Sequence, residues 1–387
     1  MIMATDNKNK VLNVPNLRFP EFKEAWKDSN IGKCFDLYSG NTPSRMEKEH
    51  FIGDVNWITS GELKEHYIGD TKERISEKAA ADNNLRILPV GTFVMAIYGL
   101  EAEGVRGTCS ITVKTSTISQ ACMAFTPKSN VSNEFLYSWY KKHGNKIGIR
   151  YAQGTKQQNL SYDIIEKFPI RYPSIEEQEK LNTFISLLDS RIATQNKIIE
   201  QLQSLIKGIY DKTFANFSKY QTLSAICKIQ KGQQINGEEL SEFGEYYVMN
   251  GGIEPSGYYD KYNTMPNTIS ISEGGNSCGY IQFNTVPFWS GGHCYTLQGI
   301  STEYNTHFVY QYLKSKEKEI MSLRIGSGLP NIQKKDLEIF PIPELSLETQ
   351  IRISNGINKI ETKLKQALNM LSAYQTQKAY LLRNLFI

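Results

Sequence analysis

Residues 174–214 read SIEEQEKLNTFISLLDSRIATQNKIIEQLQSLIKGIYDKTF, and this stretch decides the fold of the chain. It contains no proline and a single glycine, Gly208, so it can form one long helix. Ser174 followed by Glu177 is typical of a capping box at a helix start. Apolar residues then recur in alternating steps of four and three, a heptad pattern that requires a helical partner. This first seam contains Leu181, Ile185, Leu188, Ile192, Ile199 and Leu202, with Gln195 as a polar member.

The partner lies in the same chain, at residues 346–386, which read SLETQIRISNGINKIETKLKQALNMLSAYQTQKAYLLRNLF. Its seam contains Ile353, Ile357, Ile360, Leu364, Leu371 and Tyr374, with Lys378 as a charged member. Each position follows a position of the first seam by 172 residues, the same separation as between Asn159 and Asn331 upstream. The tripeptide Phe-Pro-Ile recurs at this offset too, after Asn159 and after Asn331. Two seams in one register, each with the same lead, indicate a duplicated unit, in which Gln195 and Lys378 are candidates for setting the register.

Composition limits the class of protein. The 387 residues suffice for two or three domains, and the mean hydropathy is −0.42. Without an apolar run near membrane length or an apolar signal core, we expect a cytoplasmic protein with no membrane contact. The six cysteines form no CxxC pair and are expected to be reduced thiols. The net charge of +4 is only mildly basic and does not by itself indicate nucleic-acid binding.

The order of the patterns predicts five segments and an α+β fold. We expect an N-terminal tail (1–30), a first mixed α/β unit (31–172), a first long helix (173–218), a second mixed α/β unit (219–343) and a second long helix (344–387). Within the first unit, residues 107–127 are rich in Thr, Ile and Val and predict strands, and residues 133–149 have helical spacing. Residues 87–99 predict a pair of strands around Pro89. The long helices are expected to form an antiparallel coiled coil about an internal pseudo-two-fold axis, because a two-fold across two equivalent helices makes them antiparallel, like a C₂ contact inside one chain.

Three motifs, in this order and partly duplicated, carry a resemblance to a known family. NWITSGEL lies at residues 56–63, and a G-x4-N-[LI] loop occurs at 154–160 and again at 326–332. An E-x-Q-x-[KR] helix opening occurs at Glu176 and again at Glu348. With these motifs the chain, from about Leu17 to Ile387, resembles the DNA specificity subunit of type I restriction-modification systems.

The resemblance implies a function without catalysis. Each globular unit would be a target recognition domain that reads one half of a bipartite, asymmetric DNA site. The two long helices would act as a spacer and bind two modification (methyltransferase) subunits, and the restriction subunits would join through the complex. Methylation and cleavage would belong to these partners, so the chain itself is expected to be no enzyme.

The residues agree with the absence of catalysis. The sequence contains no N-P-P-[YF] tetrapeptide of amino-methylases and no GxxxxGK[ST] phosphate loop. His293 and Cys294, together with Cys278, could ligate a metal, but four-ligand spacing is missing and a turn is the preferred interpretation. Glu238 and Glu239 are interpreted as a solvated turn rather than as catalytic carboxylates. We therefore predict no catalytic residue, no metal and no cofactor.

Double-stranded DNA is the predicted ligand, and the loop at 154–158 with its counterpart at 326–329 is the leading contact. Glycine permits close backbone approach to phosphate, and Thr, Lys and Gln can donate to phosphates or base edges. A plain turn, or for the basic residues a solvated helix face, is the alternative interpretation. The predicted DNA-contacting residues are Thr42, Ser44, Arg45, Ser60, Glu62, Lys142, Lys146, Arg150, Gly154, Thr155, Lys156, Gln157, Lys231, Gln233, Gln234, Asn250, Lys314, Arg324 and Ser327.

Two other classes of function compete with this interpretation. A stand-alone regulator could use two readers on a coiled-coil ruler, and it would bind its site without modification subunits. A structural coiled-coil adaptor would not contact DNA, and a steep salt dependence of DNA affinity would exclude it.

Overall fold

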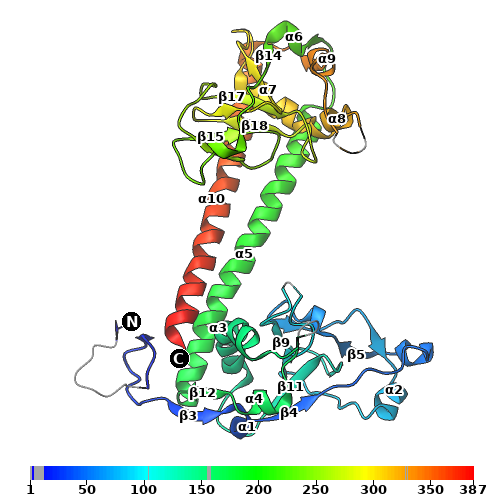
Figure 1. Cartoon of the computed structure of the whole chain (residues 1–387), viewed down its shortest axis with the longest axis vertical. Helices are drawn as coiled ribbons and strands as arrows, with labels where there is room; N and C mark the ends of the chain where they lie inside the picture. The colour runs from blue at the N-terminus through cyan, green and yellow to red at the C-terminus, as the bar shows by residue number, and fades with distance from the viewer. Residues whose placement is uncertain (1, 4–12, 103, 155–157, 327, 329) are drawn as a thin grey trace. The chain divides into compact units, whose positions relative to one another are not determined.

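The computed structural model describes residues 2–3, 13–102, 104–154, 158–326, 328 and 330–387. The chain divides into two compact units, of which the first comprises residues 1–194 and 371–387 and the second residues 195–370. Each long helix contributes one part of its length to each unit. The units are described separately below (Figure 1).

Two sheets build the globular part of the first unit. The larger has the order β4-β11-β8-β9-β6, with only the β6·β9 pair parallel, and the smaller has the order β10-β5-β7, with β10 parallel to β5. The strands of the larger sheet are β4 (Phe35–Ser39), β11 (Cys122–Pro127), β8 (Phe93–Ala96), β9 (Cys109–Thr112) and β6 (Tyr67–Ile68). Those of the smaller are β10 (Ser116–Ile118), β5 (Val55–Ile58) and β7 (Arg74–Ile75).

Helix α3 (Asn133–Tyr151) packs on the larger sheet and closes the core of this unit (Figure 1). Ser132 caps it by accepting a hydrogen bond from the Phe135 N–H, and the ring of Tyr140 meets Phe93 edge-on. Shorter elements complete the unit: β1 (Ile2–Met3), β2 (Leu17–Arg18), β3 (Lys27–Asn30), α1 (Ile31–Cys34), η1 (Lys48–Phe51), η2 (Ser60–Glu62), α2 (Glu77–Asp82), α4 (Tyr162–Glu166) and β12 (Pro169–Tyr172).

The second unit repeats the order of four strands of the larger sheet and of all three strands of the smaller sheet. Its sheets have the orders β14-β20-β17-β18 and β16-β15-β19, again with one parallel pair, β15·β19, in the smaller sheet. The strands are β14 (Lys228–Lys231), β20 (Cys294–Gln298), β17 (Thr268–Ser272), β18 (Ile281–Asn284), β16 (Gly257–Tyr259), β15 (Tyr246–Met249) and β19 (Trp289–Ser290). The remaining elements are β13 (Tyr220–Thr222), α6 (Leu223–Ile226), η3 (Gly237–Glu239), α7 (Thr306–Ser315), α8 (Glu317–Ser322), α9 (Lys334–Glu338) and β21 (Pro341–Pro343). Strand β6 of the first unit has no counterpart among the described residues.

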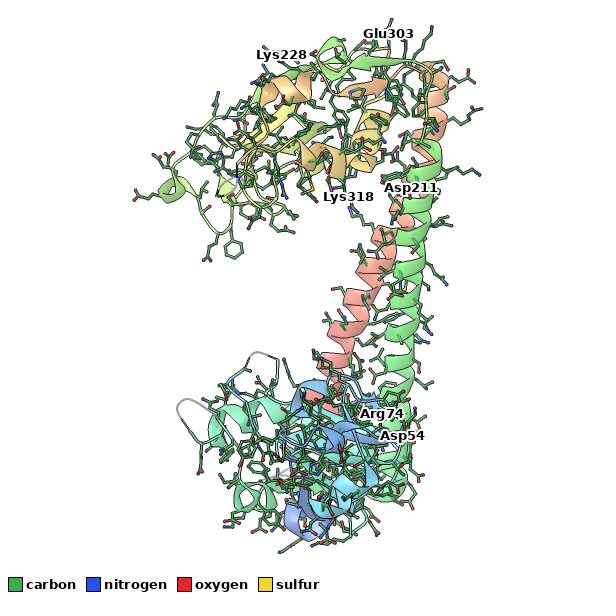
Figure 2. The ribbon with its side chains drawn as sticks, turned by 90° about the vertical axis from the view of Figure 1, so that its right-hand side faces the viewer. Asp54, Arg74, Asp211, Lys228, Glu303 and Lys318 are labelled. Atoms are coloured by element: carbon green, nitrogen blue, oxygen red, sulfur yellow. The ribbon has the colours of Figure 1, made fainter. Side chains whose placement is uncertain are left out.

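The long helices are α5 (Ile175–Thr213) and α10 (Leu347–Leu385), each of 39 residues. All predicted seam residues are buried or half-buried, while side chains between them stand out into solvent (Figure 2). In the second unit Gln195 Nε2 donates to the Ala367 carbonyl at 3.0 Å and the Tyr210 hydroxyl donates to Glu361 at 2.7 Å. Residue numbers thus rise along one helix as they fall along the other, which confirms the antiparallel pairing and the predicted fold class.

The pair Gln195–Ala367 marks the centre of the repeat. Its members are 172 residues apart, which is the offset between the two sequence seams. Antiparallel helices that meet at equivalent positions have a local two-fold axis at that point, so the local axis of the helix pair passes between Gln195 and Ala367. Gln195 is 7% exposed, and its amide satisfies a helix carbonyl inside an otherwise apolar seam.

A buried glutamine fastens the start of each long helix to the globular part of its own unit. Gln178 accepts a hydrogen bond from the Ser132 N–H and donates to the carbonyls of Asn130 and Pro173. Gln350 accepts from the Asn305 N–H and donates to the carbonyls of Glu303 and Leu345. Both glutamines are 0% exposed, and every partner is a backbone group. The E-x-Q-x-[KR] motif therefore has a structural reason in both copies.

Three local predictions need correction. Much of the expected tail is structured, because β3 pairs with β12 and Arg18 bonds the Glu177 carboxylate through both oxygens. Residues 87–92 form no strand of their own and contribute only an isolated bridge from Leu88 to Ser116 beside β8. Ser174 does accept from the Glu177 N–H at 3.4 Å, but the Glu177 carboxylate turns to Arg18 and Trp26 instead of closing the capping box.

Candidate nucleic-acid interface

A close backbone approach at Gly40 brings two of the predicted contact loops of the first unit together. A Cβ atom on Gly40, which follows β4, would lie 1.9 Å from the Ile118 carbonyl oxygen, so only glycine fits. The Asn41 N–H donates to the same carbonyl, and the Ser119 N–H donates to the carbonyl of Ile58 at the end of β5. The residues after β4 and those after β5 consequently share one edge of the unit.

Of the predicted residues after β4, Arg45 is already engaged within the chain. Its guanidinium bonds both oxygens of Glu73, lies 4.5 Å from the centre of the Phe51 ring and holds the pKa of the Glu73 carboxyl below its usual range. Thr42 is half-buried, whereas Ser44 is exposed and accepts a hydrogen bond from the Met46 N–H. Only Ser44 among these three offers an exposed side chain with no charged partner in the described structure.

The residues after β5 form a capping box that the chain uses internally. Glu62 accepts from the Thr59 N–H and hydroxyl through one oxygen and from the Lys72 N–H through the other. The carboxylate therefore shapes the loop that presents Ser60 and Gly61. Ser60 is half-buried and the space around Gly61 is open. Contact with DNA at Ser60 and Glu62 stays a prediction.

The third loop of the first unit is closed by two mutual hydrogen bonds. The Gln153 N–H donates to the Asn159 carbonyl at 2.8 Å, and the Asn159 N–H donates back at 2.9 Å. Gly154 adopts a φ of 106°, which a side chain would oppose. The Leu160 N–H then donates to the carbonyl of Ile97, beyond β8, which ties this loop to the same edge. Thr155, Lys156 and Gln157, predicted to contact DNA, lie outside the described residues.

The basic residues of α3 divide into two kinds. Lys142 donates to the carbonyls of Arg383 and Phe386 and so caps the end of α10, a structural task that leaves it little freedom for phosphate. Lys146 and Arg150 are exposed and line a pocket of about 360 Å³ together with aromatic residues, among them Tyr151, over whose ring Arg150 lies. These two cations remain candidates for phosphate contact.

The second unit builds the same edge around Gly232. A Cβ atom there would lie 2.2 Å from the Gly291 carbonyl oxygen, and the Gln233 N–H donates to the Ser290 carbonyl at 2.8 Å. Asn250, which follows β15, accepts from the His293 N–H at 3.0 Å. The predicted residues after β14 and after β15 thus meet as in the first unit, and both Gln233 and Gln234 are exposed.

The second glycine loop is also repeated in detail. Ile325 and Asn331 exchange two backbone hydrogen bonds, Gly326 adopts a φ of 101°, and the Ile332 N–H donates to the Glu273 carbonyl. Ser327 lies outside the described residues. Gln153 and Asn159 exchange the same two backbone hydrogen bonds as Ile325 and Asn331, and Gly154 and Gly326 both have positive φ. The backbone therefore explains why each copy of the loop begins with glycine.

The two basic residues predicted on this side of the second unit differ in their surroundings. Lys314 donates to the Ile281 carbonyl and to Glu317 and lies over the Tyr280 ring, which gives it a structural role. Arg324 is exposed immediately before the hairpin of Ile325 and Asn331 and remains a candidate for DNA contact.

Sequence reasoning missed a charged group at this edge. Glu273 follows β17, has a side chain that is 11% exposed and pairs with Lys231 at 2.6 Å. A lone glutamate after a strand belongs to no motif, so the sequence gives no signal for it. For His293 the sequence offers a metal ligand with Cys278 and Cys294 or a residue in a turn, and the turn is the preferred interpretation. Within the part of the chain that the structure describes, no group of three or more His, Cys, Asp and Glu side chains could hold a metal ion.

Comparison with known proteins agrees with this architecture. The family described as the type I restriction modification DNA specificity domain matches residues 23–204 and again 218–370. The specificity subunit of the type I restriction enzyme MjaIX from Methanocaldococcus jannaschii is 24% identical over 371 residues, which covers 82% of this chain and 84% of the relative. A putative type I specificity subunit of Mycoplasma pneumoniae is 35% identical over 155 residues, about 40% of either chain.

Among solved structures, the type I restriction-modification S subunit from M. genitalium superposes with a TM-score of 0.69 at 20% identity, over 97% of this chain and 99% of that one. A chain from a study of complex assembly and conformational transition of the type I system gives a TM-score of 0.57 at 14% identity. These likenesses concern the fold.

The chain belongs to the type I restriction-modification DNA specificity family. It has two target recognition domains, and its role is DNA specificity within such a system. Subunits of this family recognise DNA and do not catalyse the reaction, in agreement with the prediction that the chain is no enzyme. Within the described residues, no helix is both long and apolar enough to cross a bilayer.

Proposed function

We propose that the chain reads a bipartite, asymmetric DNA site, with one half-site for each target recognition domain. The main support is the duplicated edge: in each unit a glycine fixed by a facing carbonyl, a loop after the middle strand of the small sheet and a hairpin opened by a glycine with positive φ lie together. Backbone that is the same in both copies positions side chains that differ. The half-sites are therefore expected to differ in sequence.

The long helices are proposed to set the spacing and to hold two modification subunits, with restriction subunits joining through the complex. Two apolar positions on the outer faces recur at the repeat offset and support this. Ile175 and Leu347 are 38% and 41% exposed, and Ile198 and Met370 are 40% and 49% exposed. Scattered apolar surface residues are ordinary, but recurrence at equivalent positions suits two copies of one partner. Ile175→Glu together with Leu347→Glu should reduce co-purification of the modification subunit and leave the chain folded.

Exchange of one domain tests the modular reading of DNA. Residues 219–343 are replaced by the corresponding domain of another family member, and methylated positions are mapped across the genome of a host that also makes the modification subunits. One half-site should change and the other should stay. A change in both halves, or in neither, would contradict the proposal.

Co-purification and binding separate this function from a stand-alone regulator. The complex with modification subunits should bind the mapped site with an affinity that falls steeply with salt, since phosphate contacts release counterions. Equal, site-specific binding by the chain alone, with no partner retained from the host, would favour the regulator.

A further inference from the structure

Four side chains of the second unit form what we call the Glu273 cluster: Lys231, Glu273, His293 and Tyr295. Glu273 Oε1 lies 2.6 Å from Lys231 Nζ and accepts a hydrogen bond of 2.8 Å from the Tyr295 hydroxyl. The other oxygen, Oε2, is buried and has no hydrogen-bond partner among the described residues; His293 Nδ1 is 3.6 Å away, beyond hydrogen-bond length. The cluster therefore holds one acceptor that the described chain does not use.

The Glu273 cluster borders all three contact loops of its unit. Lys231 directly precedes Gly232. The Glu273 carbonyl accepts from the Ile332 N–H of the glycine loop, and the His293 N–H donates to Asn250. Any DNA that meets these loops therefore lies next to the cluster.

The first unit fills the same four positions without this chemistry. The registers Cys122↔Ala96 and Cys294↔Ser272 make Ile97 equivalent to Glu273 and Ala121 equivalent to His293. The registers Met123↔Ser39 and Tyr295↔Lys231 complete the match. The backbone is the same, because the Ile97 N–H donates to the Ala121 carbonyl as the Glu273 N–H donates to that of His293, each at 2.9 Å. The apolar versions are closely packed, with Ile97 3% and Met123 1% exposed.

The first unit forms the same backbone without these side chains, so the fold alone does not require the charged cluster. The Glu273 side chain is only 11% exposed, and taking a carboxylate out of water is costly unless pairing and hydrogen bonds offset the cost. An uncharged solution for the same backbone exists in the first unit. The charged cluster is therefore best explained by a ligand that uses its donors and its unpaired acceptor, Glu273 Oε2.

The chemistry of the pair favours a base edge over a phosphate. Lys231 offsets the charge of Glu273, so the pair gains little from the counterion release that drives phosphate binding. Instead it offers ammonium donors beside a free carboxylate oxygen. In the major groove, guanine presents the acceptors O6 and N7 and cytosine presents the N4 amine, and the preferred pairings are lysine with guanine and glutamate with cytosine.

We propose that Lys231 and Glu273 together read one G·C base pair in the half-site of the second domain. Lys231 donates to O6 or N7 of guanine, and Glu273 Oε2 accepts from the N4 amine of cytosine. The His293 side chain, 62% exposed, turns aside as the base pair enters. This inference rests on the proposed function, because it requires that the loops of the second unit meet DNA.

Mapping of methylated sites in a host that makes this chain with its modification subunits tests the proposal. The half-site of the second domain should contain a G·C pair that Glu273→Gln and Lys231→Met each relax, with discrimination at that position falling roughly ten- to hundredfold. The double variant Lys231→Ser, Glu273→Ile copies the first unit, so it should fold and show the same relaxation. Lys228→Met is the matched control on the same strand (Lys228 is labelled in Figure 2) and should change nothing at that position.

The other outcomes overturn the proposal. A second half-site without a G·C pair, an unchanged half-site in both single variants, or a uniform loss across all sequences, as a phosphate contact produces, would each contradict it. An unchanged first half-site shows that a variant has folded and assembled. Sequence-independent modification by the unaltered complex would instead overturn the proposed function itself.

Discussion

The first recognition unit places Ile97 and Met123 where the second places Glu273 and Tyr295, on backbones held by the same hydrogen bonds. The two copies also share a glycine packed against a carbonyl, a hairpin that begins with a glycine of positive φ, and a buried glutamine near the start of the long helix. The shared features are set by contacts of backbone atoms, whereas the side chains at the edge differ between the copies. In this fold the backbone that holds the contact loops in place can therefore stay the same while the side chains of those loops change.

The largest effect is expected when a side chain blocks the close approach of a glycine to a facing carbonyl, which both units contain. Gly40→Ala puts a methyl group 1.9 Å from the Ile118 carbonyl oxygen, and Gly232→Ala puts one 2.2 Å from that of Gly291. Each should destabilise its own unit by about 3 kcal/mol and abolish recognition of one half-site. Gly208→Ala, in α5, where nothing lies within 4 Å, is the control. Thermal unfolding and methylation mapping give the readouts, and equal damage from all three variants would refute the argument.

Next in size is the removal of the buried glutamines. Gln178→Ala and Gln350→Ala each leave three backbone groups without their side-chain partner and should each cost about 2 kcal/mol. Gln201→Ala, at an exposed position of α5, should be neutral. Chemical unfolding compares the variants. Clearly unequal losses in the two copies would show that the repeat does not extend to this contact.

Acid should weaken the first unit through His143. Burial, reinforced by the charges of Lys142 and Lys146, lowers the pKa of His143 to about 4. The unfolded chain binds a proton there near pH 6.5 and the folded one does not, so stability falls as the pH drops from about 6.5 towards 4. From pH 7 to pH 5 the loss should be about 2 kcal/mol. Melting curves of His143→Asn, compared with the unaltered chain, should show a smaller loss over that range, and an identical loss would count against a neutral buried imidazole.

The smallest effect is expected at His293. Its imidazole forms no hydrogen bond in the described structure and is 62% exposed, so His293→Ala should change stability by less than about 0.5 kcal/mol. The half-site of the second domain should also keep its G·C pair. Loss of that G·C pair from the mapped site would contradict this expectation and assign the reading of the pair to His293.

Much of the fold could be predicted because its signals are local or periodic. The two seams, their common offset and the loops beginning at Gly154 and Gly326 are visible in the sequence, and the structure confirms the antiparallel helices that they imply. The unpredicted contacts join distant residues. Lys142 meets the carbonyl of Phe386, 244 positions away, and Arg45 meets Glu73, 28 positions away.

The candidate site was predictable to a smaller extent for a related reason. The repeat aligns well where backbone geometry demands the same residue, as at Gly40 and Gly232. The alignment of the two halves fails where the copies differ. Glu273 is recognised as the equivalent of Ile97 only from the strand registers of the two sheets. Side chains that carry specificity are thus the ones that comparison of the two sequence halves hides.

The contacts of Gln178 and Gln350 near the starts of the long helices have a consequence for the exchange of domains by recombination. Gln178 and Gln350 form hydrogen bonds only with main-chain atoms. These contacts therefore do not depend on which side chains the attached domain carries. A recombination event that exchanges one domain for another therefore requires no change at either glutamine.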